Sequence, residues 1–409
     1  MSTEAMEVRE AAGSYVLKAE KEVPPGYKRT EVGVIPEDWN VYRLADHFVI
    51  YAGGDVPKDD YSDVQSENHP YPIYANAIKE KGLYGYTSLN RGKPNSLTIT
   101  ARGYLGHAEY RSKPFFPIVR LLVLEPCGRL DAKYTTYVIN ERVQFAIEST
   151  GVPQLTAPQV GKYLVAAPST LEEQRAIATA LSDVDALITA LYKLIAKKRA
   201  IKTAAMQQLL TGKTRLPGFS GEWETKRFGE IASIRNTKVF PSNVPWGTLC
   251  VELEDIGQGS GRLIGYSEAH QTSSAKYRFM KGDILFGRLR PYLRKYWLAE
   301  EDGICSTEIW PLVIDKGQAF NGFVYAIIQT DRFIEVAGVS YGTHMPRADW
   351  NVLCNFEVAL PGVEEQTAIA QVLSDMDAEI AALEARRDKT RAIKQGMMQQ
   401  LLTGRVRLV

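Results

Sequence analysis

The sequence predicts an α+β protein in which two β-rich domains are joined by two long antiparallel helices, related by an internal pseudo-twofold axis. Three observations predict this fold. A block of 45 residues occurs twice, at 172–216 and 364–408, with 28 identical positions and no gap. Both copies show the apolar spacing of an amphipathic helix. The segment before each copy instead contains short β-prone runs separated by Gly, Pro and Asn, which is typical of strands and turns.

The repeat divides the chain into five segments, and the two domains open on matching signatures. The first signature is Pro36-Glu37-Asp38-Trp39 and the second is Gly221-Glu222-Trp223. A duplicated unit that pairs with its own copy would bring the C-terminus close to Gly26, where the first domain begins. The predicted segments are a mobile leader at 1–25, a domain at 26–167, a helical region at 168–212, a domain at 213–361 and a helical region at 362–409.

The composition excludes several classes of protein. The 409 residues are 45% hydrophobic and 24% charged with a formal net charge of +1, values typical of a soluble globular protein and not of a uniformly basic one. No apolar run approaches the roughly 20 residues of a membrane span, and the charged segment 1–25 lacks the apolar centre of a signal peptide. The four cysteines have no CxxC spacing and no nearby His, so we expect no metal site and a reducing, cytoplasmic location.

Each helical region carries an apolar stripe that needs a partner. A stripe this narrow is not buried by one helix alone, and the nearest equivalent surface is the other copy of the repeat. We therefore predict an antiparallel coiled-coil spacer; the alternative is that each helix packs only on its own domain. The predicted contacts are Val184, Leu187, Leu191, Leu194 and Ile201 in the first helix, and Met376, Ile380, Leu383, Ile393 and Met397 in the second.

Within the domains, four runs are predicted to be strands, at 96–101, 119–124, 283–286 and 309–313. Basic residues interleaved with Tyr follow the first and third runs. Because an Arg guanidinium can pair with two acceptors on guanine or with phosphate, and Tyr can stack on a base, we predict exposed nucleic-acid-binding clusters. The alternative is a solvated hairpin with scattered charge. The predicted DNA-binding residues are Arg91, Lys93, Arg102, Tyr104, Arg111 and Lys113 in the first domain, Arg288, Arg290, Tyr292, Arg294 and Lys295 in the second, and Thr343, His344 and Arg347 in a third segment.

Enzymatic motifs are incomplete. Gly212-Lys213-Thr214 resembles the end of a phosphate-binding loop, but the required glycine is replaced by Gln207, and the segment ends a helix instead of starting one. The chain contains no Asn-Pro-Pro-Tyr or Asp-Pro-Pro-Tyr run of an adenine methyltransferase. The five histidines are scattered, so we expect no catalytic residue in this chain.

The repeated block resembles the two conserved regions of the specificity subunits of type I restriction-modification systems. The resemblance rests on Glu172-Glu173-Gln174 through Leu209-Leu210-Thr211-Gly212 and on the equivalent run that ends at Gly404. The opening 26–39, the run 282–294 and Ser306-Thr307-Glu308 are similar to the target-recognition domains of that family. The resemblance extends from residue 26 onward.

This resemblance implies a DNA-binding specificity subunit without catalytic activity. Each target-recognition domain would read one half of a bipartite sequence in double-stranded DNA, and the helices would set the length of the unread spacer. The expected partners are two methyltransferase subunits, which would bind S-adenosylmethionine and methylate adenine, and a restriction subunit. The chain itself is expected to bind no cofactor and no membrane. The alternative that the residues leave open is a non-enzymatic protein–protein scaffold with a helical spacer.

Overall fold

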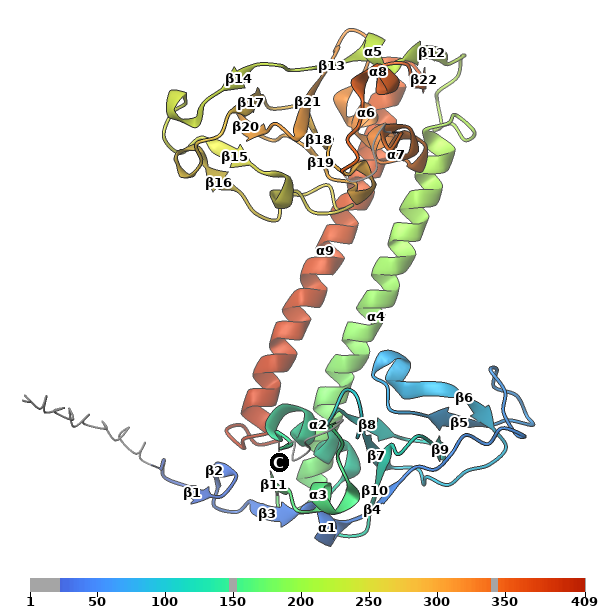
Figure 1. Ribbon diagram of the computed structural model, residues 1–409, viewed down its shortest axis with the longest axis vertical. Coiled ribbons are helices and arrows are strands. Elements are labelled where there is room, and N and C mark those ends of the chain that lie inside the picture. The colour runs from blue at the N-terminus through green and yellow to red at the C-terminus, as the bar shows by residue number, and fades with distance from the viewer. Residues whose placement is uncertain (1–22, 147–152, 340–344, 409) are drawn as a thin grey trace, which may run out of the picture. The chain divides into compact units, whose positions relative to one another are not determined.

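The computed structural model describes residues 23–146, 153–339 and 345–408 of the 409-residue chain (Figure 1). The chain forms two compact units. Unit 1 contains the residues up to Thr189 together with Asp388–Val409, and unit 2 contains Ala190–Arg387. Most of the predicted leader at 1–25, and the predicted DNA-binding residues Thr343 and His344, lie outside the described residues.

In unit 1, the described residues before the long helix form fifteen elements. They are β1 (Tyr27–Thr30), β2 (Gly33–Pro36), β3 (Asn40–Arg43), α1 (Leu44–His47), β4 (Phe48–Ala52), β5 (Tyr71–Tyr74), η1 (Lys79–Gly82), β6 (Leu83–Thr87), β7 (Ser96–Ile99), β8 (Ala108–Arg111), β9 (Phe116–Pro117), β10 (Leu122–Pro126), α2 (Ala132–Arg142), α3 (Ala157–Gly161) and β11 (Leu164–Ala167). Helix α2 packs on the sheet that contains β7, β8 and β10. Asp131 caps α2, because its carboxylate accepts from the backbone N–H of Tyr134 at 2.9 Å.

Unit 2 follows a similar order. Its elements are β12 (Glu224–Arg227), α5 (Phe228–Ile231), β13 (Ala232–Ile234), β14 (Lys238–Val239), η2 (Pro241–Asn243), β15 (Leu249–Val251), η3 (Leu253–Asp255), β16 (Ser267–Glu268), η4 (Ala269–Gln271), β17 (Lys276–Phe279), β18 (Ile284–Gly287), η5 (Pro291–Leu293), β19 (Tyr296–Leu298), β20 (Gly303–Ser306), β21 (Ile309–Ile314), α6 (Asn321–Ile328), α7 (Asp331–Ala337), α8 (Trp350–Leu353) and β22 (Glu357–Leu360). The side chain of Thr330 caps α7 by accepting from the backbone N–H of Phe333.

The two units share a core topology, which confirms the predicted α+β fold with internal symmetry. The antiparallel sheet β4-β10-β7-β8 of unit 1 corresponds to β13-β21-β18-β19 of unit 2, and the pair β3–β11 corresponds to β12–β22. Strands β7 and β18 are buried at every position, so both faces of each sheet are covered. Unit 1 adds the sheet β6-β5-β9, and unit 2 adds β14-β17-β20-β15-β16.

Two helices of 39 residues, α4 (Leu171–Leu209) and α9 (Val363–Leu401), each contribute to both units. In unit 2, the ammonium nitrogens of Lys198 and Lys202 lie 2.6 Å from the carboxylates of Glu379 and Asp377, respectively. The later residue of α4 thus pairs with the earlier residue of α9, so the two helices run in opposite directions. The predicted antiparallel pairing is confirmed within this unit.

The buried seam between the helices is narrower than the predicted stripe. Leu191, Ile195 and Ile380 are buried, with exposed fractions of 3–7%. Val184, Leu383, Met376 and Met397 are partly buried. Two paired helices bury only one face of each other, and the positions of the stripe furthest from that face remain in solvent. The expectation that the whole stripe is buried is therefore wrong for four of its residues, which are exposed: Leu187, Leu194, Ile201 and Ile393.

The end of each helix is buried in a domain core. Leu209 and Leu210 at the end of α4 pack in the core of unit 2, and Leu401 and Leu402 at the end of α9 pack in the core of unit 1. The Tyr27 hydroxyl donates to the backbone carbonyl of Gly404 at 3.2 Å. The segment after α9 therefore lies beside the start of the first domain, as the repeat predicts.

Candidate nucleic-acid interface

Each unit has a loop at the corresponding place in its sheet, and both loops carry an exposed Arg and an exposed Tyr. The loop joins β7 to β8 in unit 1 and β18 to β19 in unit 2, which are corresponding strands of the two sheets. The first loop contains Arg102 and Tyr104, and the second contains Arg290 and Tyr292, each pair separated by one residue. All four side chains are exposed, and 68% of Tyr104 and 57% of Tyr292 is accessible to solvent. Arg and Tyr are the residues expected at a surface that contacts phosphates and bases.

The loop of unit 2 is held by backbone hydrogen bonds to two distant segments. Arg288 N–H donates to the Glu308 carbonyl at 2.9 Å, and Arg290 N–H donates to the Pro346 carbonyl at 2.8 Å. Both Arg290 and Arg294 have left-handed backbones, with φ of 52° and 51°. A non-glycine residue in this conformation costs about 1–2 kcal/mol, so the surrounding contacts must stabilise this loop shape.

The loop of unit 1 is braced in a similar way. Leu155 N–H donates to the Ala101 carbonyl at 2.9 Å, and a β-bridge joins Arg102 to Gln154. Gly103 and Gly106 supply positive φ values of 76° and 84°, which glycine adopts at little cost. Both loops therefore present an Arg and a Tyr on a fixed backbone.

Arg111 is buried and not exposed beside these loops, so the prediction that it belongs to an exposed basic cluster is wrong. Its side chain is buried, and the guanidinium lies 3.6 Å from the centre of the Tyr74 ring. It donates to the Thr98 hydroxyl at 3.0 Å and to the Lys81 carbonyl at 2.9 Å. Burial lowers the pKa of Arg111 below its usual value. The residue stabilises the contact of β8 with β5 and η1.

The other basic residues of unit 1 differ in how they are held. Arg91 is exposed and lies 5.1 Å from the Tyr51 ring. The ammonium of Lys93 lies 3.0 Å from Glu125, which also accepts from the Tyr51 hydroxyl at 2.8 Å. Lys113 is exposed. These three side chains remain candidates for contact with phosphate.

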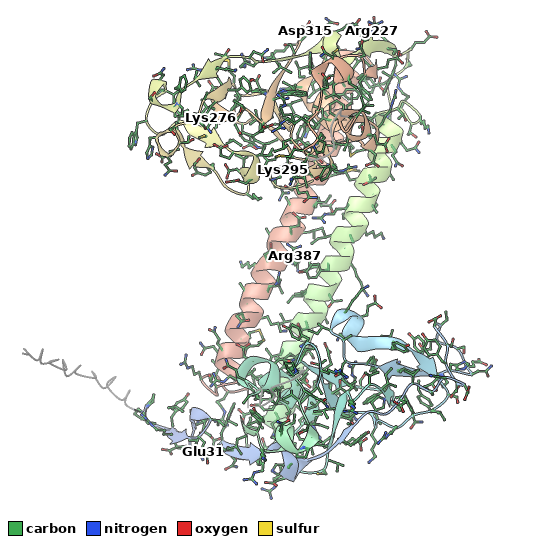
Figure 2. All side chains as sticks on the ribbon, viewed as in Figure 1. Glu31, Arg227, Lys276, Lys295, Asp315 and Arg387 are labelled. Atoms are coloured by element: carbon green, nitrogen blue, oxygen red, sulfur yellow. The ribbon has the colours of Figure 1, made fainter. Side chains whose placement is uncertain are left out.

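Three of the predicted DNA-binding residues of unit 2 contact other residues of the same unit. The guanidinium of Arg288 lies 5.2 Å from the Trp310 ring, and its Nε is buried without a hydrogen-bond acceptor among the described residues. Arg294 donates to the Asp331 carboxylate and, at 3.3 Å, to the Gln329 carbonyl. Lys295, labelled in Figure 2, donates to the Leu253 carbonyl at 2.8 Å. The expectation that Arg288 and Arg294 are freely exposed is wrong. Arg288 packs on the ring of Trp310 and Arg294 pairs with the carboxylate of Asp331, and both partners come from other segments of the chain.

Arg347 is exposed and is paired with Glu308. Its Nε and Nη2 lie 3.0 Å and 2.7 Å from the two carboxylate oxygens of Glu308. These hydrogen bonds hold the pKa of Glu308 below its usual range and raise the pKa of Arg347. The sequence drew attention to Glu308 through its family resemblance and to Arg347 through its segment, but nothing in the sequence indicated that the two meet.

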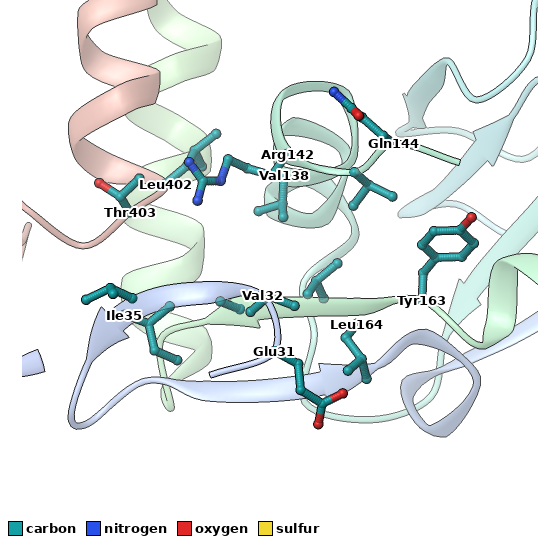
Figure 3. A pocket seen from close by; sticks show the side chains of 14 residues that line it. Glu31, Val32, Ile35, Val138, Arg142, Gln144, Tyr163, Leu164, Leu402 and Thr403 are labelled. Atoms are coloured by element: carbon teal, nitrogen blue, oxygen red, sulfur yellow. The ribbon is translucent and has the colours of Figure 1, made fainter. Parts of the chain in front are cut away.

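Two cavities of unit 2 border the β18–β19 loop, because Arg294 lines both of them. A pocket of about 310 Å³ in unit 1 lies between the β1–β2 hairpin, the end of α2, β11 and the segment that follows α9 (Figure 3). Its walls include Val138, Leu164 and Leu402, and they carry no cluster of acid, base and nucleophile. Within the described residues, no group of His, Cys, Asp and Glu could hold a metal ion, and no helix is long and apolar enough to cross a membrane.

The fold contains two similar units, each with an exposed loop that carries an Arg and a Tyr. Residues 36–202 and 220–391 match the family described as the type I restriction modification DNA specificity domain. The chain belongs to this family, which makes it a DNA specificity protein and a non-catalytic component of a type I restriction-modification system.

Relatives of this chain resemble it over most of its length. The type I restriction enzyme MjaVIII specificity subunit of Methanocaldococcus jannaschii is 24% identical over 404 residues, which cover 91% of this chain and 94% of the relative. The EcoDI specificity subunit of Escherichia coli is 22% identical over 408 residues, which cover 90% and 88%. The crystal structure of the type I restriction-modification S subunit from M. genitalium has a TM-score of 0.65 at 15% identity, covers 89% of this chain and 96% of its own, and supports the fold.

Proposed function

We propose that this chain recognises a bipartite sequence in double-stranded DNA, with each unit reading one half. The observation that carries the proposal is the duplicated loop, in which Arg102 and Tyr104 of unit 1 match Arg290 and Tyr292 of unit 2. In each half, phosphate contacts would fix the orientation of the loop, and base-edge contacts in the major groove would supply the specificity. Two similar domains in one chain suit a target with two separate halves.

The proposed partners are two methyltransferase subunits, with a restriction subunit as a further partner. In this proposal the candidates for contact with these subunits are the exposed apolar side chains of the helices, Leu187, Leu194, Ile201 and Ile393. Methylation requires the target adenine to be turned out of the duplex. In this proposal the methyltransferase subunits carry out that step and bind S-adenosylmethionine. This chain positions those subunits on the DNA target.

The proposal is tested by selecting duplexes from a randomised library with the full chain and its co-expressed methyltransferase subunits. We expect two short conserved blocks separated by a spacer of fixed length, and an affinity that falls steeply as salt rises. Exchanging residues 217–360 for those of another specificity protein should change one block and leave the other unaltered. Selection of no common sequence, with equal affinity at all salt concentrations, would favour a protein–protein scaffold instead.

A further inference from the structure

Glu308 and Arg347 form an ion pair at the protein surface. It lies at the edge of the unit 2 loop, where 31% of the Glu308 side chain and 40% of the Arg347 side chain is exposed. An ion pair at this exposure adds little to folding stability, because water screens the charges and an ordered Arg loses rotamer freedom. Its more direct effect is to hold the guanidinium of Arg347 in one orientation.

The orientation leaves the outer edge of the guanidinium available. Glu308 accepts from Nε and from Nη2, which is the side edge of the planar group. No described residue accepts from Nη1 of Arg347. The remaining N–H groups on Nη1 and Nη2 form a pair of parallel donors, which matches the two acceptors that guanine presents in the major groove, O6 and N7.

The backbone places this Arg beside the exposed loop. A β-bridge joins Leu289 to Arg347, and Ala348 N–H donates to the Arg288 carbonyl at 2.8 Å. Glu308 itself accepts the Arg288 N–H through its carbonyl, just before β21 begins. Glu308 and Arg347 are therefore fixed to the same short stretch of backbone that leads to Arg290.

Unit 1 shows that the loop does not need such a pair to fold. There the β-bridge partner of Arg102 is Gln154, and no ion pair between Arg102 and a carboxylate is found among the described residues. The bridge partner of the loop is thus Gln154 in unit 1 and the carboxylate-held Arg347 in unit 2. Removal of Arg347 should affect one half of the target only.

We propose that Arg347 reads a guanine in the half of the target contacted by unit 2, and that Glu308 is the positioning residue that aims it. The inference rests on the proposed function, since it names one base contact within it. A preorganised Arg binds without losing rotamer freedom at the moment of contact, so Glu308 contributes to base selectivity through Arg347 and not by touching DNA.

The test uses the full chain with its methyltransferase subunits and the duplex selected by the wild type. Affinities are measured for this duplex and for duplexes that carry each single base-pair change. For Glu308→Gln we expect a loss of about ten-fold in discrimination at one guanine, within the range of a single bidentate contact. Affinity for unrelated duplex should not fall, because the variant loses a negative charge. Arg347→Lys keeps the charge but not the fork, so it should lose discrimination at the same base pair.

Glu301→Gln is the matched control, because it removes an exposed negative charge from the same unit without facing Arg347. It should leave discrimination unchanged. The inference is overturned if Glu308→Gln binds every duplex more tightly with unaltered selectivity, which would make Glu308 a neutralising charge only. It is also overturned if all duplexes weaken equally as the melting temperature falls. Failure of the wild type to select any sequence would instead refute the proposed function.

Discussion

Arg407, from the second copy of the repeat, forms an ion pair with Glu173, from the first copy. The Arg407 guanidinium lies 2.7 Å from one Glu173 oxygen and also donates to Asp38 at 2.7 and 2.9 Å. The equivalent pair in unit 2 is Arg215 with Glu365, and each residue lies 192 positions from its counterpart (407 − 215 and 365 − 173). Each domain is thus completed by the end of the other copy.

Replacing Arg407 by Ala should destabilise unit 1. Glu173 has a 3% exposed side chain and would lose its partner, which costs about 3–5 kcal/mol for a fully buried pair. Because 34% of the Arg407 side chain is exposed, we expect about 2 kcal/mol instead. Urea denaturation would measure the loss, and Glu173→Gln in the same chain should recover part of it. Equal losses in the single and double variants would contradict a direct coupling.

Arg111 and Arg102 should give opposite results when replaced by Ala. Loss of the buried Arg111 removes its contact with Tyr74 and leaves the Lys81 carbonyl without a donor, so we expect about 3 kcal/mol of destabilisation. Loss of the exposed Arg102 should change stability by less than about 0.5 kcal/mol and weaken DNA binding. Thermal unfolding and duplex affinity together decide between the two roles. A stable Arg111→Ala variant with weakened DNA binding would restore the original prediction.

In unit 2, Arg290 and Tyr292 should contribute to DNA binding without contributing to stability. Each Ala variant should lose about 1–3 kcal/mol of binding free energy, through a lost Arg contact or a lost base stack. Arg288→Ala is the internal comparison, because its guanidinium packs on Trp310. We expect the main effect of that variant to be a lower melting temperature of the protein. Fluorescence anisotropy with labelled duplex at two salt concentrations measures the binding change, and unaltered affinity of the Arg290 and Tyr292 variants would remove this loop from the interface.

Glu125 should contribute a pH-dependent part of the stability. Burial raises its pKa, but hydrogen bonds from Tyr51 and Lys93 outweigh burial and leave the pKa below its usual value. A lowered folded-state pKa means that the stabilisation is present above the unfolded pKa and is lost as pH falls through the folded one. The difference in unfolding free energy between wild type and Glu125→Gln should therefore be largest near neutral pH and shrink between about pH 5 and pH 3. A constant difference over that range would contradict the assignment.

If the helices set the spacer, lengthening both of them should lengthen it. Seven residues inserted after Thr189 and seven after Arg387 add two turns, about 10 Å, and keep the contacts inside each unit in register. We expect the selected spacer to grow by about three base pairs while both half-site sequences are retained. Insertion into α4 alone should impair folding, because the helices could no longer pair. An unchanged spacer in the double insertion would show that the helices are not the ruler.

The sequence by itself determined the repeat, the antiparallel helix pair and the return of the chain end to the first domain. These features depend on a pattern that is written twice, so each copy predicts the environment of the other. The sequence also located three buried strands well: the runs at 96–101, 283–286 and 309–313 correspond to β7, β18 and β21. The run at 119–124 is displaced, because β10 begins at Leu122.

Only the tertiary structure decided which charged and apolar side chains face solvent. Arg111 is held by Tyr74 and Arg294 by Asp331, and both partners are more than 30 residues away in the chain. Local pattern cannot reveal such partners, since a basic residue next to a Gly turn looks the same whether its side chain points out or stacks on a distant ring. The apolar stripe of the helices shows the same limit of local pattern: Leu194 fits the apolar spacing, yet its side chain is exposed.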